Sequence, residues 1–152
     1  MAQWFEVKVK YDKMLETGIQ KTVTEPYLVD ALSFTEAEAR ITEEMQPYIS
    51  GDFVVSAVKK ERYADIFYHE GGDRWYKVKA NYITIDEKTA AEKKTANMML
   101  VQAANFEEAL KVFLEGMKGT MADFEIASIT ETALMDVFAA NLSETLADKD
   151  KK

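Results

Sequence analysis

The chain has 152 residues, 47% of them hydrophobic, which is enough to bury a core without a metal or disulfide staple. It has no cysteine, which excludes disulfides, thiolate zinc sites and cysteine nucleophiles. The net charge of −8 excludes a basic body that wraps nucleic acid non-specifically, but leaves room for a local basic face. No apolar run approaches the length of a membrane span or a signal peptide, so we expect a soluble cytoplasmic protein with no membrane partner.

Two strands are predicted near the N-terminus. From Trp4 to Tyr11 apolar and polar residues alternate, as in a strand with one buried face. A second strand is predicted over residues 23–31. Because Pro26 has no N–H to donate, we expect this strand to lie at a sheet edge there.

A helix and a third strand follow. The sequence from Ser33 to Glu36 fits a capping box, in which a serine oxygen accepts from a backbone N–H and the glutamate reaches back. A one-sided apolar stripe continues from there, and Pro47 and Gly51 end the helix. The third strand starts at Phe53 and is either long or bent near Lys59, reaching residue 67.

The polar segment 69–74 is the only clear linker in the sequence. It contains the adjacent glycines 71 and 72 and the chain's one histidine, His69. Asp65, Glu70 and Asp73 lie near His69, and all are metal-ligand types, but the spacing matches no known motif. We therefore interpret His69 as a polar linker residue.

The second half of the chain repeats the first, block by block and in the same order. The matched blocks are 4–11 with 75–82, 28–31 with 100–103, 34–45 with 106–117, 52–55 with 123–126, and 63–67 with 134–138. This repeat assigns residues 95–103 to a strand, although the run could pass for a helix. It also places a second capping box at Asn105–Glu108, a helix end at Gly119, and a third strand from Phe124 to Phe138.

These elements predict an α+β fold built by tandem duplication of a strand-strand-helix-strand unit. Both helices are expected on one face of a predominantly antiparallel sheet, arranged either as one continuous sheet or as two small ones. The predicted organisation is a first repeat at 1–68, a linker at 69–74, a second repeat at 75–140 and a polar tail at 141–152. We expect the repeats to form one compact pseudo-twofold domain; the strand order stays open.

The sequence offers no support for catalysis. It has no Ser/His/Asp set, no P-loop and no G-x-G-x-x-G. Paired carboxylates such as Glu43-Glu44 fit a solvated helix face, and the methionines fit core packing. We therefore predict no catalytic residue, no cofactor and no metal, and we expect that the protein is not an enzyme.

The strongest functional hint is a face that combines tryptophan and lysine. Six residues share strand parity in the two repeats: Trp4, Lys8, Lys10, Trp75, Lys77 and Lys79. Such a face could bind single-stranded nucleic acid, because indole rings stack on bases and ammonium groups meet phosphates. The alternative, which we favour, is that the tryptophans pack structurally or face a protein partner, and that the lysines protect the sheet.

The sequence from Tyr27 to Arg40, together with the start Trp4-Phe5-Glu6-Val7-Lys8-Val9, resembles an uncharacterised domain-of-unknown-function family. The resemblance covers nearly the whole chain except the tail. It implies a bacterial or phage-related origin, in gut Bacteroidetes and their phages or mobile elements, and a cytoplasmic setting. It implies no catalytic residue and no cofactor.

Three functional hypotheses follow. The first is a non-enzymatic interaction module that contacts a protein partner or self-associates, for instance through a strand edge. The second is a single-stranded DNA or RNA binder that uses the tryptophan and lysine face. The third is an enzyme whose site the sequence does not reveal.

Overall fold

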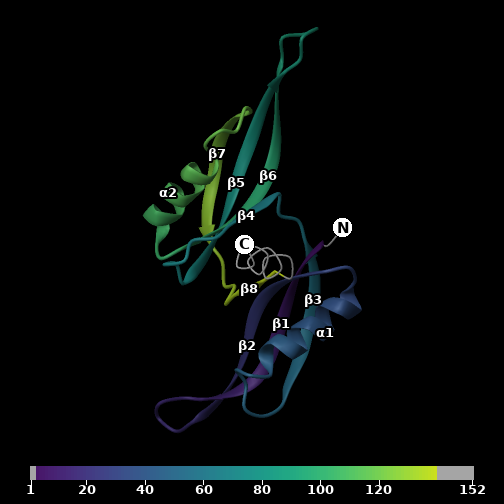
Figure 1. The fold of residues 1–152 in the computed structure, drawn as a ribbon, viewed down its shortest axis with the longest axis vertical. Helices are drawn as coiled ribbons and strands as arrows, with labels where there is room; N and C mark the ends of the chain where they lie inside the picture. The colour runs from purple at the N-terminus through teal and green to yellow at the C-terminus, as the bar shows by residue number, and fades with distance from the viewer. Residues whose placement is uncertain (1–2, 140–152) are drawn as a thin grey trace, which may run out of the picture. The chain divides into compact units, whose positions relative to one another are not determined.

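The computed structural model describes residues 3–139, which form two compact units (Figure 1). The described part of unit 1 is residues 3–61 and 134–139, and unit 2 is residues 62–133. Each unit has a four-stranded sheet with one helix packed on one face. The predicted α+β class, with predominantly antiparallel sheet, is confirmed, and the structure selects two small sheets over a continuous one. The predicted tail at 141–152 lies outside the described residues.

Unit 1 has the strand order β3-β1-β2-β8. All its neighbouring strands are antiparallel except β2 and β8, which pair in parallel. Its elements are β1 (Gln3–Met14), β2 (Gln20–Ala31), α1 (Phe34–Met45), β3 (Phe53–Glu61) and β8 (Val137–Phe138).

Unit 2 has the strand order β4-β6-β5-β7, and only the β4–β6 pair is parallel. The two units also share a register irregularity in the central strand, between Lys8 and Val9 in β1 and between Lys79 and Ala80 in β5. The elements of unit 2 are β4 (Asp65–Phe67), β5 (Arg74–Ile85), β6 (Glu92–Ala103), α2 (Phe106–Gly116) and β7 (Asp123–Glu131).

The alternation in the sequence produces the core of each unit. Phe5, Val7 and Val9 point toward α1 and are almost fully buried, as are their counterparts on β5 toward α2. The helices contribute residues spaced by about one turn, so that one stripe of each helix is buried. These core residues are Ala37, Ile41 and Met45 on α1, and Ala109 and Phe113 on α2. No helix among residues 3–139 is long and apolar enough to cross a membrane.

Both helices begin at the predicted caps. Ser33 Oγ accepts a hydrogen bond from Glu36 N–H at 3.1 Å, and Asn105 Oδ1 accepts one from Glu108 N–H at 2.9 Å. In unit 2 the glutamate also reaches back, because Glu108 Oε1 accepts from the N–H of Ala104 at 2.9 Å. Each cap satisfies N–H groups that have no partner inside the helix.

The third strand of each repeat is interrupted. β3 ends at Glu61 and the chain resumes strand structure in β4, while β7 ends at Glu131 and the chain resumes it in β8. β4 then pairs with β6 of unit 2, and β8 pairs with β2 of unit 1. The last segment of each repeat therefore completes the unit built by the other repeat.

Pro26 lies just before the point where β8 covers β2. β8 pairs only with Leu28 and Val29, and the carbonyl of Pro26 accepts a hydrogen bond from Met135 N–H at 2.9 Å. Since proline has no N–H, this side of β2 can form a ladder only beyond Pro26.

Candidate functional site

The tryptophan and lysine face of unit 1 carries mixed charge. Lys8 and Lys10 are exposed, but Trp4 is half-buried and its register partners are Asp30 and Glu61. Both carboxylates are paired with cations, Asp30 with Arg40 and Glu61 with Lys59, so the surroundings of the indole are close to neutral. In unit 1 the predicted face therefore consists of two exposed lysines and a half-buried indole between paired charges.

In unit 2 the second indole is not available for stacking. Trp75 is only 2% exposed, and the edge of the Tyr68 ring packs against it with centroids 5.8 Å apart. Lys77 is half-buried, with its Nζ 5.7 Å from the centre of the Tyr63 ring, and only Lys79 is exposed. Strand parity places Trp75 on the same face as these lysines, but it does not show that the face is covered at Trp75.

Unit 2 has a cleft that the sequence did not reveal. It has a volume of about 770 Å³ and lies between β4, the edge strand of its sheet, and α2. Its lining combines an apolar floor with charged side chains from the helix: Ile66, Phe67, Tyr68, His69, Glu108, Lys111, Val112, Glu115 and Gly116.

The floor of the cleft depends on a glycine. The ring of Phe67 packs edge-on against Phe113 of α2, with centroids 5.8 Å apart. A Cβ at Gly116 would lie 2.7 Å from carbons of the Phe67 ring, closer than real Cβ contacts occur. Gly116 therefore lets β4 approach the helix closely enough for Phe67 to form the floor.

The end of the cleft is fixed by a turn over residues 69–72. Gly72 N–H donates to the carbonyl of His69 at 2.9 Å. The side chain of Gln102 on β6 then binds the turn twice, accepting from His69 N–H and donating to the Gly72 carbonyl, both at 3.0 Å. A Cβ at Gly72 would lie 2.5 Å from the backbone N of Ala103. The segment predicted as a linker is thus a turn held against β6, within unit 2.

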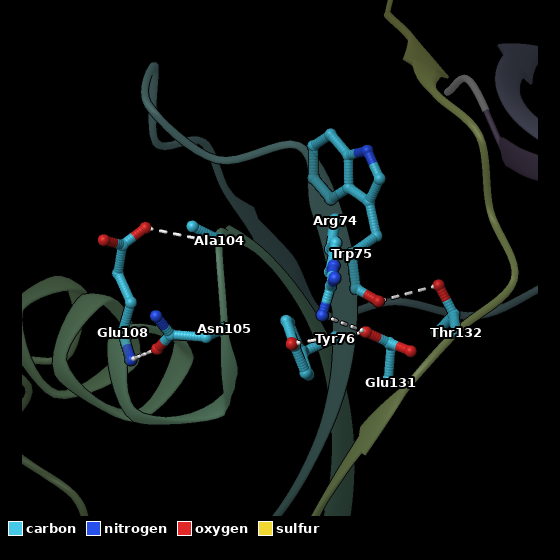
Figure 2. A network of polar contacts seen from close by, with 8 residues as sticks. All are labelled: Arg74, Trp75, Tyr76, Ala104, Asn105, Glu108, Glu131 and Thr132. Carbon is cyan, nitrogen blue, oxygen red and sulfur yellow. Dashed lines mark hydrogen bonds and ion pairs between the residues drawn. The ribbon is translucent and has the colours of Figure 1, made fainter.

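This turn places His69 beside the start of α2. Its Nε2 lies 3.2 Å from Glu108 Oε1. The same oxygen accepts a hydrogen bond from Ala104 N–H, which Figure 2 shows. Farther along the helix, Glu115 forms an ion pair with Lys118 at 2.8 Å, and Lys111 lines the cleft. Among residues 3–139, no group of three or more His, Asp or Glu side chains is arranged to hold a metal ion.

Comparison with known proteins identifies the family. A family model described as "Domain of unknown function (DUF4494)" matches residues 3–140. The chain belongs to the DUF4494 family. No curated protein and no solved structure gives a significant match. The resemblance to a domain-of-unknown-function family is confirmed at this level, and the DUF4494 family brings no assigned activity.

A second polar network in this DUF4494 chain holds the first residues of β5 beside the last residue of β7 (Figure 2). Glu131 Oε1 accepts from Arg74 Nη1 at 3.3 Å and from the Tyr76 hydroxyl at 3.4 Å. The backbone N–H and the hydroxyl of Thr132 both donate to the carbonyl of Trp75 at 2.8 Å. The chain is therefore anchored at Thr132, immediately before it leaves unit 2.

Unit 1 has a small counterpart of the cleft, of about 200 Å³, between α1 and β8, and Tyr27 is in its lining.

Glu25 lies beside Tyr27 and accepts hydrogen bonds from the hydroxyls of Tyr11 at 2.6 Å and Tyr27 at 3.4 Å. Burial, followed by the hydrogen bond and charge of Glu25, raises the pKa of Tyr11 to about 12. Burial and the same carboxylate also raise the pKa of Tyr27.

Sequence reasoning missed the cleft because its parts come from distant segments. His69 and Glu108 carry no joint motif, and Gly116 reads as an ordinary helix end. The one usable signal is the difference between the repeats, since Lys111 and Gly116 stand where the first repeat has Ala39 and Glu44.

Proposed function

We propose that the chain is a non-enzymatic interaction module that binds an extended segment of a partner protein in the cleft between β4 and α2. The observation that supports this most is the position of the 770 Å³ cleft beside an edge strand. An edge strand offers unpaired backbone groups to an incoming segment, and a neighbouring pocket selects one of its side chains.

The chemistry of the lining indicates the kind of segment. The floor of Ile66, Phe67 and Val112 suits a large apolar side chain. On the helix side, the lining carries the two carboxylates of Glu108 and Glu115 and the single ammonium group of Lys111. Glu115 also pairs with Lys118, which is outside the lining, and the whole chain carries −8. An apolar residue flanked by basic residues is therefore the best complement.

Binding is favoured over catalysis because the one His–Glu contact in the cleft has a structural function. Glu108 Oε1 accepts the N–H of Ala104 at the entry to α2, in addition to contacting His69. This carboxylate therefore already has a role in holding the entry to α2. The absence of cysteine fits the cytoplasmic setting that we include in this proposal. The bacterial or phage-related origin that we also propose rests on the sequence resemblance alone.

The test uses two short probe peptides and the full chain labelled with ¹⁵N. Acetyl-Lys-Phe-Lys-amide is titrated to millimolar concentration while backbone amide shifts are followed, and acetyl-Glu-Phe-Glu-amide is titrated in parallel. We expect saturable shifts centred on residues 66–69 and 111–116 with the lysine peptide. The glutamate peptide should bind at least about fivefold more weakly, because the charge complementarity is reversed.

A matched pair of variants tests the location. Lys111→Trp places a bulky ring over the cleft and should abolish the shifts. Ala39→Trp puts the same ring at the corresponding exposed position of α1 and should leave them unchanged. Equal binding by the parent and Lys111→Trp, or no saturable shift at these amides, would refute the proposed site.

A further inference from the structure

The two short parallel strands dock on their sheets in the same way. Ala64 N–H donates to the carbonyl of Met98 at 2.8 Å, and Met135 N–H donates to the carbonyl of Pro26 at 2.9 Å. Immediately after these bonds, β4 pairs with β6 and β8 pairs with β2. The two docking modes thus agree residue by residue across the repeats.

The docked segments also share a local chemistry, Asp-Ile-Phe in one and Asp-Val-Phe in the other. In each, the aspartate Oδ1 accepts from the N–H of the next residue at 2.8 Å, which presets the start of the strand. Each phenylalanine then packs on its unit's core, Phe67 against Phe113 and Phe138 against Tyr27. Each segment is therefore a short strand that binds the edge of one sheet through its own backbone and phenylalanine contacts.

Each segment also belongs to one repeat and completes the unit of the other. β4 follows β3 of unit 1 but lies in unit 2, and β8 follows β7 of unit 2 but lies in unit 1. Reciprocal exchange of matching elements is the relation found between the protomers of a domain-swapped dimer. Here it occurs within a single chain.

We propose that the edge of β2 from Pro26 to Val29 also accepts β8 from a second copy of the chain, giving a strand-exchanged dimer. β8 is the segment that exchanges, since within the described residues its connection to unit 2 is the short stretch after Thr132. β4, in contrast, lies between β3 and β5 along the chain. Its release would therefore require the connections on both sides of it to open.

Exchange conserves every contact that β8 makes in unit 1. The balance between closed chain and dimer therefore depends on protein concentration relative to the effective concentration of the tethered segment, which is on the order of millimolar for a short linker. The proposal is independent of the peptide cleft, which lies in unit 2 and involves neither β2 nor β8.

The experiment uses single-cysteine variants of the full chain, which has no cysteine of its own. Pro26→Cys and Met135→Cys, one of them labelled with ¹⁵N, are mixed in denaturant, refolded together and oxidised. Mass spectrometry then counts the mixed disulfide dimer. We expect its fraction to rise about tenfold when total protein rises from about 0.02 to about 0.2 mM, as mass action requires.

The repeat supplies the matched control. Ala64→Cys and Met98→Cys form the equivalent contact in unit 2, where no exchange is expected, so their mixed dimer should stay at the level of random pairing. A chain carrying both Pro26→Cys and Met135→Cys should close on itself as a monomer at low concentration. The proposal is wrong if the Pro26 and Met135 mixture gives no more mixed dimer than the control pair, or if the double variant does not close.

Discussion

The corresponding positions Asp30 and Gln102 hold different partners in the two units. In unit 1, Arg40 on α1 donates to both the carbonyl and the carboxylate of Asp30, which is 5% exposed. In unit 2 the residue corresponding to Arg40 is Val112, and Gln102 instead binds the turn at 69–72. One backbone position therefore anchors a helix in one unit and a turn in the other.

This difference accounts for the cleft. The turn held by Gln102 places His69 on the cleft rim, and Val112, shorter than arginine, forms part of the floor. At the corresponding place, between α1 and β8, unit 1 has a pocket of about 200 Å³ that is lined by Tyr48 and Met135 among others. The two units therefore share the residues that bury the sheet and cap the helices, while the neighbouring residues differ and the larger cleft lies in unit 2.

The largest expected effect comes from breaking the turn of unit 2. Gly72→Ala should lower the free energy of unfolding by about 3 kcal/mol, because its Cβ would meet backbone atoms of Ala103 that cannot move aside. The free energy of unfolding is measured by urea denaturation, followed by the fluorescence of Trp75 in a Trp4→Phe background. Gly71→Ala is the control, since its Cβ would make only an ordinary 3.7 Å contact with His69. Equal losses in the two variants would show that the turn is not held as described.

An intermediate loss of stability is expected when residues of unit 1 are replaced by the corresponding residues of unit 2. Arg40→Val should cost about 2 kcal/mol, because the largely buried Asp30 carboxylate loses its guanidinium partner. Adding Asp30→Gln removes the buried charge and should recover at least half of that loss. Urea denaturation followed by circular dichroism compares the three proteins. A double variant that is less stable than Arg40→Val would contradict this account.

Replacing Tyr11 is expected to have the smallest effect on stability at neutral pH and a clear effect at alkaline pH. Its pKa is about 12 in the folded chain and about 10 when unfolded, so its stabilising contribution is complete below pH 10 and is lost as the pH rises toward 12. Tyr11→Phe should cost about 1 kcal/mol at pH 7 and reduce the alkaline loss of stability. Urea unfolding from pH 7 to 11.5 measures both.

Tyr82 provides the control for that experiment in unit 2. It corresponds to Tyr11, and Asn97 stands where unit 1 has Glu25, so no carboxylate occupies that position. Tyr82→Phe should therefore cost less stability at pH 7 than Tyr11→Phe. Equal losses in the two variants would show that the Glu25 contact is not the cause.

The features that could be predicted from the sequence are those set by local periodicity. The alternation from Trp4 to Tyr11 and from Trp75 to Tyr82 assigned the inward faces, and the caps at Ser33 and Asn105 set both helix starts. The repeat also assigned residues 95–103 to a strand against their apparent helical character. Side-chain alternation and capping need only neighbours along the chain, so one sequence is sufficient to read them.

Three features could not be predicted from the sequence: where the ends of the third strands pair, what covers Trp75 and where the cleft lies. The Asp-Ile-Phe segment of β4 has the same apolar pattern whether it pairs within its own repeat or with β6 of the other. Strand parity placed Trp75 on a face but could not show that the face is closed there. The cleft needs His69 and Glu108 to meet across a turn that Gln102 holds in place. These outcomes depend on pairing between distant segments, which local periodicity does not encode.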